Sequence, residues 1–310
     1  MHLAQRFVGL FLSFPAFAQT GPQFHWRLDE SNGGTAFASS GGSNGTLAGG
    51  TTWAPTGGHH QGAARFDGVD DRIVLGSCDF TNGGSALSLS LWVKPDFVTG
   101  MERTLVAKTV GPLVSDHIWS IAFINGTALR FRLKTAGTTT ELSTPPSSLF
   151  GGTWYHIVAV YDGVEMRLYA NGALMANGQK SGSIGYQPQA PAALGATSTG
   201  TQPFSGWLDD VRVYDRALSD AEIIDILFES VVLQVDDTVN TTPALTVVDG
   251  TVRLPSDGWQ SATILDGAGR CISVHPRSMG NTMEVPQTAG SYLVCLQDLS
   301  RRTAVRIIVL

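Results

Sequence analysis

The chain has 310 residues, of which 36 are glycine and 15% are charged, and its formal net charge is −6. This length allows a sizeable core and two domains, while the acidic balance argues against a surface for nucleic acid or anionic membranes. Abundant glycine with few charges favours short strands joined by tight turns over long solvated helices.

The first residues have the organisation of an export signal. Arg6 precedes an apolar run from Phe7 to Phe14, and Ala16-Phe17-Ala18 forms a small-residue cleavage sequence. The apolar run is too short to span a bilayer, so a membrane anchor is the weaker interpretation. We expect residues 1–18 to be a signal peptide and the mature protein to leave the cytoplasm.

Residues 24–226 are dominated by short strand patterns. In "ALSLSLWVKP" (86–95) leucine and valine alternate with serine, and in "LRFRLK" (129–134) apolar residues alternate with basic ones. A period of two predicts half-buried strands. Asn-Gly and Asp-Gly pairs between such segments suit two-residue hairpin turns. Many short strands at this spacing predict an all-β sandwich or jelly roll.

One short helix is expected near the end of this region. In "ALSDAEIIDILFES" (217–230), Ser219 is followed three residues later by Glu222, which is a capping box, and apolar residues then recur on one face. We expect this helix to cover one end of the sandwich. The polar, threonine-rich segment "DDTVNTTPA" follows, and it predicts a linker at residues 229–240 before a second β region.

Five segments occur in the order typical of one family: "FHWRLDES", "GAARFDGVDDRIVL", "LSLWVKP", "WYHIVAVYDGVEMRLYANGAL" and "FSGWLDDVRVYDRALSDAEI". They resemble a LamG-like jelly roll, the concanavalin A-like sandwich of laminin G modules, pentraxins and several carbohydrate-binding modules. The resemblance implies a jelly-roll domain at residues 19–228 that binds a glycan or a surface protein. It departs at Ala38, where the family usually has an aspartate.

The tail resembles a different family. "GTVRLPSDGWQSATILDGAGRCI" and "GSYLVCLQDLSRRTAVRIIVL" are similar to the C-terminal sorting domain of type IX secretion cargo in Bacteroidota. The resemblance implies a small Ig-like β-sandwich at residues 241–310 that ends in a hairpin. It also implies the outer-membrane translocon and its β-barrel shuttle protein as partners, and delivery through the periplasm to the cell surface or the medium. An ordinary second β domain is the alternative.

The cysteines are too few for a disulfide framework. Cys271 and Cys295 both fall in strand patterns of the tail, and export permits them to pair, whereas Cys78 would stay single.

Catalysis is not expected. Glycoside hydrolases share the sandwich, but none of the seven glutamates begins the Glu-x-Asp-x-x-Glu strand that carries a retaining carboxylate pair. His59-His60 in "GGHHQG" could bind a metal, although no acidic residue follows at ligand spacing. We predict a binding protein, with a structural or adhesive surface component as the alternative and a hydrolase as the less favoured one.

A structural calcium ion is the predicted cofactor. In "WLDDVRVYD", Asp209, Val211 and Val213 occupy alternate positions and should share one face of a strand. If the valines face the core, the Asp209 carboxylate is buried and needs a partner. Calcium would satisfy it with hard oxygen ligands. The resemblance implies Asp209 as a ligand, with Asp29 and the carbonyl of Gly68 beside it. The alternatives are a turn cap or a pair with an arginine such as Arg65. Asp70-Asp71 is expected to shape a turn.

Aromatic residues near loops are the candidates for stacking on a sugar. These are Trp53, Trp119 and Tyr186, although packing is the favoured role of each. Trp92 and Trp154 lie within strand patterns and are expected in the core.

Overall fold

The structure is a computed structural model. It describes residues 21–79, 84–96, 100–111, 113–125, 128–146 and 149–229, and in the tail residues 246–248, 251–254, 261–265, 271–276, 282–284, 290–297 and 302–309. The predicted signal peptide and all but the first residue of the predicted linker lie outside the described residues.

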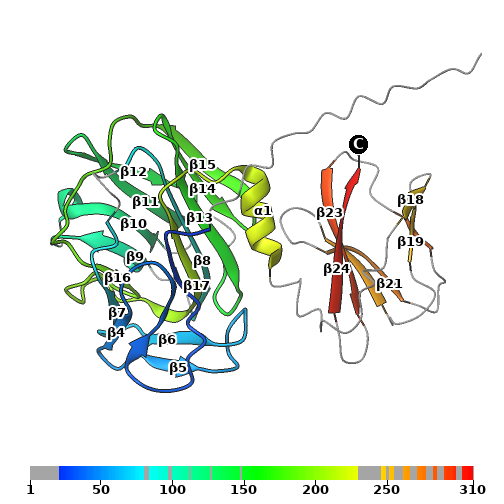
Figure 1. The fold of residues 1–310 in the computed structure, drawn as a ribbon, viewed down its shortest axis with the longest axis horizontal. Helices are drawn as coiled ribbons and strands as arrows, with labels where there is room; N and C mark the ends of the chain where they lie inside the picture. Colours follow the sequence, from blue (N-terminus) through cyan, green and yellow to red (C-terminus); the bar gives the residue numbers. More distant parts are fainter. Residues whose placement is uncertain are drawn as a thin grey trace, which may run out of the picture.

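Two antiparallel sheets form the first domain (Figure 1). Sheet A has nine strands. They are β15 (Ala173–Gln179), β14 (Glu165–Ala170), β13 (Tyr155–Tyr161), β8 (Leu87–Pro95), β17 (Ser205–Tyr214), β1 (Phe24–Trp26) and β3 (Ala38–Ser40) in spatial order, with β6 (Ala63–Asp67) beside β17 and β5 (Thr52–Ala54) beside β6.

Sheet B has eight strands. In spatial order they are β12 (Thr138–Ser143), β11 (Ala128–Thr135), β10 (His117–Ile124), β9 (Arg103–Thr109), β16 (Ala192–Leu194), β7 (Arg72–Leu75), β4 (Gly45–Ala48) and β2 (Thr35–Ala36). A 3-10 helix, η2 (Val114–Asp116), lies between β9 and β10. The predicted jelly-roll sandwich is confirmed.

The first and last strands of the domain pair with each other. β1 lies antiparallel to β17, with Phe24 opposite Val213 and Trp26 opposite Val211. The sheet is therefore completed by segments that are far apart in the sequence.

The core lies between the sheets and follows the predicted alternation. Leu89 and Leu91 of β8 and Phe131 of β11 are buried in one apolar cluster. The serines between the leucines are buried as well, with Ser88 at 0% and Ser90 at 1% exposure. The outer face of sheet A is therefore covered, which a half-buried strand pattern does not predict.

Helix α1 (Asp220–Phe228) supplies part of this cover. Ser219 accepts a hydrogen bond from the backbone of Glu222, whose carboxylate accepts one from the backbone of Ser219, so the predicted capping box is confirmed. Helix α1 lies against sheet A (Figure 1). Ile223 and Ile226 pack there against Val158 and other residues of the outer face. The expected position at one end of the sandwich is wrong, because the apolar face of the helix is complementary to the outer face of the sheet.

The tail contains two further antiparallel sheets. One consists of β18 (Thr246–Val248), β19 (Thr251–Arg253) and β22 (Thr282–Glu284), and the other of β21 (Cys271–Pro276), β20 (Ser261–Leu265), β23 (Gly290–Gln297) and β24 (Arg302–Val309). β23 and β24 pair from Gln297 opposite Arg302 to Gly290 opposite Val309, which confirms the predicted C-terminal hairpin.

The backbone of the tail separates the two cysteines. Cys271 on β21 and Cys295 on β23 lie on opposite sides of β20, opposite Leu265 and Thr263 respectively. Two strand spacings amount to roughly 10 Å, which is more than the Cα–Cα distance of about 7 Å that a disulfide tolerates. This register does not suit a disulfide between them.

Within the described residues, no helix combines the length and the apolar character that crossing a membrane requires.

Candidate functional site

A glycine-rich loop between β5 and β6 lies over the outer face of sheet A. The ring of His59 stacks on Trp92 with centroids 3.3 Å apart and planes at 10°. Trp92 also packs against His156, with ring centroids 5.2 Å apart. Trp92 is buried as predicted, at 5% exposure, but it lies beneath this loop and not in the core between the sheets.

Two distant carboxylates hold the backbone of the loop. Asp209 Oδ2 accepts a hydrogen bond from the His60 N–H at 2.7 Å, and Asp29 Oδ1 accepts one from the Gly62 N–H at 2.9 Å. A Cβ at Gly58 would lie 1.8 Å from the carbonyl oxygen of Gly62, so only glycine fits there. The structure therefore brings Asp29 and Asp209 to one loop, "GGHHQG".

A β-bulge decides which way Asp209 points. On β17 Asp209 lies opposite Trp92, yet Arg212 lies opposite Ser90, so β17 carries one extra residue between the two pairs. Paired residues share a face, and Asp209 therefore lies on the outer face with Trp92. The predicted burial of Asp209 is confirmed at 0% exposure. The expectation that Asp209 faces the core with Val211 and Val213 is wrong, because the bulge interrupts the alternation between Asp209 and these valines.

Three non-glycine residues at this site have left-handed backbone angles. The φ values are 63° at Leu28, 61° at Gln61 and 49° at Asp210. The Asp210 N–H donates to the carbonyl of Arg27 at 3.3 Å, which joins β17 to the segment that contains Leu28. Such conformations cost about 1–3 kcal/mol each and cluster at functional sites. No sequence signal indicated this cluster.

Asp209 keeps one oxygen unsatisfied. Its Oδ1 is buried and has no hydrogen-bond partner among the described residues. Burial raises the pKa of Asp209 to about 8, and the nearby carboxylates of Asp210 and Asp29 act in the same direction. A desolvated carboxylate with a free oxygen favours a proton or a bound cation.

The adjacent Asp210 favours the ionised form, in contrast to Asp209. Its carboxylate is 2.6 Å from His25 Nε2 and 2.8 Å from Arg212 Nη2. Although burial opposes ionisation, the hydrogen bond to His25 and the charge of Arg212 hold the pKa of Asp210 well below its usual range. Arg212 also pairs with Glu229 just after α1, and this pair ties the helix end to the sheet.

Arg65, the arginine considered as a partner for Asp209, pairs elsewhere. Its guanidinium is 2.7 Å from Asp96 Oδ2. Asp209 instead caps the backbone of the histidine loop, which is the other alternative that the sequence left open.

Gly68 lies apart from Asp29 and Asp209. It follows Asp67, which pairs with Ser205, four residues before Asp209 on β17, and this corresponds to roughly 13 Å of strand. Gly68 has a φ of 84° and belongs to the turn between β6 and β7. The structure does not bring it together with the two carboxylates.

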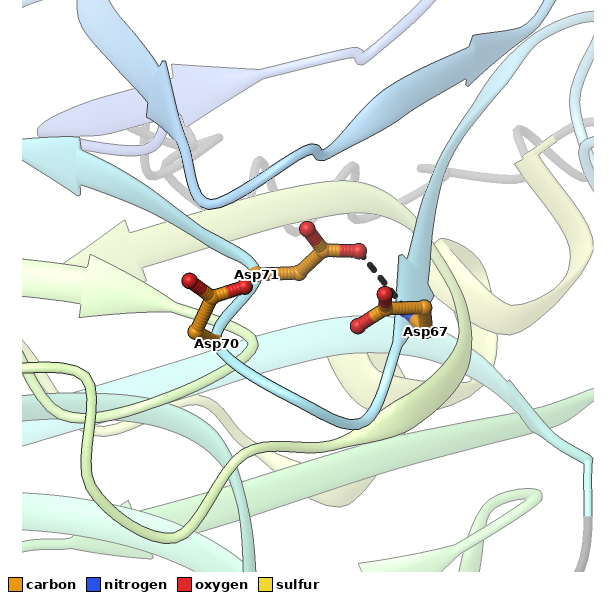
Figure 2. Close-up of side chains that lie close together, drawn as sticks. All are labelled: Asp67, Asp70 and Asp71. Carbon is orange, nitrogen blue, oxygen red and sulfur yellow. Dashed lines mark hydrogen bonds between the residues drawn. The ribbon is translucent and has the colours of Figure 1, made fainter.

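This turn contains its own acidic group (Figure 2). The ligand oxygens of Asp67, Asp70 and Asp71 lie within 4.8 Å of one another. Asp71 Oδ2 accepts a hydrogen bond from the Asp67 N–H at 2.7 Å, and Asp67 Oδ1 accepts one from the Val69 N–H at 2.8 Å. The predicted turn-shaping role is confirmed for Asp71.

The three aromatic residues considered for stacking on a sugar differ in their exposure to solvent. Trp119 is 1% exposed and belongs to the core, and Tyr186 is 52% exposed. Trp53 is partly buried and donates from Nε1 to the carbonyl of Gly33 at 2.8 Å. Trp154, expected in the core, is partly exposed, with its ring centroid 6.2 Å from that of His59.

The raised pKa of Asp209 leads to a pH-dependent prediction in the presence of a chelator. The unfolded carboxyl ionises near its ordinary value of 3.8, whereas the folded one stays protonated to about pH 8. Stability from this group is therefore complete below about pH 4 and is lost as the pH rises toward about 8. Asp209→Asn should gain stability relative to the wild type across this window, as measured by urea unfolding. The buried histidines titrate in both proteins and cancel in the difference, so a pH-independent difference would contradict the prediction.

Several solved structures share this fold. Domain 4 of AbnA, a GH43 extracellular arabinanase from Geobacillus stearothermophilus solved with arabinotriose, is 22% identical with a TM-score of 0.52, and the match covers 67% of this chain and 98% of that one. The binding domain of Paraclostridial Mosquitocidal Protein 1 is 13% identical with a TM-score of 0.56, covering 92% and 73%. The receptor binding domain of botulinum neurotoxin type G is 12% identical with a TM-score of 0.51, covering 93% and 74%.

These structural likenesses show a shared fold, and the sequence shows the family. The profile of the Concanavalin A-like lectin/glucanases superfamily matches residues 66–224, just over half of the chain. This segment runs from β6 to α1 and contains Asp209, Trp92 and the strands that carry them. The chain therefore belongs to the concanavalin A-like lectin/glucanase superfamily.

Proposed function

We propose that this chain is an exported binding protein whose jelly-roll domain recognises a glycan or a surface protein. The arabinanase domain carries this proposal, because it matches over 98% of its length and was solved with arabinotriose. The mosquitocidal and neurotoxin domains of similar fold are likewise named as binding or receptor binding domains. A structural or adhesive surface component is the second candidate.

The proposed activity is binding and not hydrolysis. The superfamily includes glucanases, so the fold is compatible with either activity. The sequence lacks the Glu-x-Asp-x-x-Glu strand of the retaining hydrolases of this fold. A hydrolase is therefore the less favoured alternative.

We also propose a structural calcium ion at Asp209, with Asp29 beside it. The residues fit the ion in two respects: Asp209 Oδ1 is a buried oxygen with no partner in the described part of the chain, and both carboxylates hold the same loop. Calcium prefers hard oxygen ligands, and its charge would offset the cost of ionising a desolvated carboxylate. Gly68 is not included in this site, because it lies near Ser205.

The proposed route of export is type IX secretion. The leader at residues 1–18 would direct the chain across the inner membrane, and the tail at 241–310 would be recognised by the outer-membrane translocon and its β-barrel shuttle. The sequence resemblance supports this proposal, and the paired β23 and β24 are compatible with it. The protein would be secreted or displayed on the cell surface.

Calcium should stabilise the wild-type chain through the Asp209 loop. A saturating concentration, about 100 times the dissociation constant, should raise Tm by about 5–10 °C over a chelated sample. Asp209→Asn should lose most of this shift, because it removes the charge that the ion neutralises. Asp71→Asn, in the acidic turn of Figure 2, is the matched control and should keep it. The reverse pattern in differential scanning fluorimetry would assign the ion to the turn.

A glycan array with the full-length mature chain tests the binding proposal. We expect selective binding to one class of oligosaccharide, reduced by a chelator if the ion supports the loop. A blank array, together with attachment to whole cells or solid polymers, would favour the adhesive alternative. Release of reducing ends from a bound polysaccharide would favour the hydrolase.

Deletion of residues 241–310 tests the export proposal. In a host with a type IX system, the truncated protein should accumulate in the periplasm while the full-length protein reaches the surface or the medium. Cell fractionation followed by immunoblotting distinguishes the two. Normal delivery of the truncated chain would refute the sorting role of the tail.

A further inference from the structure

A group of charged side chains lies on the outer face of sheet B. On β11, Arg130 and Arg132 alternate with the core residues Leu129, Phe131 and Leu133 and therefore point away from the core. Arg132 is nevertheless only 4% exposed. An arginine that is buried on the outer face of a sheet must be covered by other polar side chains.

Two glutamates from different segments provide this cover. Arg132 Nη1 is 2.7 Å from Glu102 Oε1, and Arg132 Nε is 2.6 Å from Glu141 Oε1. Arg130 contacts the same two carboxylates, with Nη1 3.7 Å from Glu141 Oε1 and Nη2 against Glu102. We call these four residues the Arg–Glu network. Each guanidinium bridges both carboxylates, and the formal charge of the network is zero.

The floor around the network is made of small side chains. Ser120 lies opposite Arg132 and Ala122 opposite Arg130 in the β10–β11 pairing, and on β9 Ala107 lies opposite Ser120. Small residues let the long charged side chains lie flat on the sheet. Among the described residues no α-helix covers this face of sheet B, because α1 packs on sheet A (Figure 1).

His117 extends the network and fixes the direction of its hydrogen bonds. Its Nε2 is 3.4 Å from Arg132 Nη1, and its Nδ1 is 3.1 Å from Ser120 Oγ. Arginine can only donate, so Nε2 accepts and Nδ1–H donates to Ser120. Burial and the charge of Arg132 lower the pKa of His117 to about 4, so the ring is neutral. The hydroxyl proton of Ser120 is then left to donate to another group.

The Arg–Glu network thus presents fixed donors and acceptors, close together and without net charge of its own. Carboxylates accept from hydroxyl groups, and guanidinium groups donate to hydroxyl and ring oxygens. We propose that the Arg–Glu network is the surface on which the jelly roll binds a neutral saccharide, an inference that rests on the proposed glycan-binding function.

The pairing within the network selects against charged ligands. A uronate or sulfated sugar would have to compete with Glu102 or Glu141 for guanidinium groups that are already neutralised. The anionic group of the sugar would also lie beside the carboxylates of Glu102 and Glu141. The network has no unpaired cation that could offset this repulsion. A neutral sugar can add hydrogen bonds to the exposed edges of the pairs, since Glu141 retains 37% exposure of its side chain.

The experiment compares variants of the full-length mature chain on neutral oligosaccharides (arabinan, xylan and glucan series) and on oligogalacturonate. Glu141→Gln preserves shape and removes one charge, and Arg130→Ala removes one bridge. Arg167→Ala is the matched control, because Arg167 pairs with Asp162 at 3.1 Å on sheet A and its side chain is 20% exposed. Melting temperatures identify any variant that fails to fold. If Arg130→Ala fails to fold, the affinity of Glu141→Gln alone tests the proposed surface.

We expect the wild type to bind a neutral oligosaccharide, and both network variants to bind it about tenfold more weakly or worse, with Arg167→Ala unchanged. Equal affinity of all variants would overturn the proposed surface while leaving glycan binding intact. Binding to oligogalacturonate alone would overturn the neutral class. A wild type that binds none of the probes would remove the proposed function and this inference with it.

Discussion

The β-bulge at Asp210 is the constraint on which the rest of the site depends. By adding one residue to β17 opposite β8, it places Asp209 beneath the histidine loop while Val211 stays in the core. It also directs Asp210 toward His25 and Arg212, whose charge stabilises its ionised form. Two adjacent carboxylates thereby acquire opposite preferences, one for a proton or a cation and the other for permanent ionisation.

Different side chains shield the two outer faces of the sandwich from solvent. Sheet A is covered by apolar residues of α1 and by a loop whose histidine stacks on Trp92. Sheet B has small residues beside Arg130 and Arg132, and two glutamates neutralise these arginines. The first face is suited to stability, because its contacts are apolar and buried. The second is suited to recognition, because its polar groups are fixed in position and partly exposed.

Patterns local in the sequence predicted the local structure. The alternation in β11, the capping box of α1 and the C-terminal hairpin each depend on neighbouring residues, and all three are confirmed. The face of Asp209 was not predictable, since no residue type marks the bulge. The Arg–Glu network was missed because Glu102 and Glu141 are distant in the sequence and meet only across sheet B. The pair His59-His60 was noticed, but not the carboxylates that hold its loop.

The pairing of β1 with β17 has a consequence for the order of events during synthesis. Phe24 pairs with Val213, so β1 has to remain without β17 until about 190 further residues have been made. At about 5–20 residues per second this delay is roughly 10–40 s. A nascent chain that ends before β17 leaves β1 and β8 each with one unpaired edge, although β1 can still pair with β3 and β8 with β13, and such edges pair readily with other chains. Sheet A is therefore completed only after β17 has been made, and until β17 pairs, these edges are open to other chains.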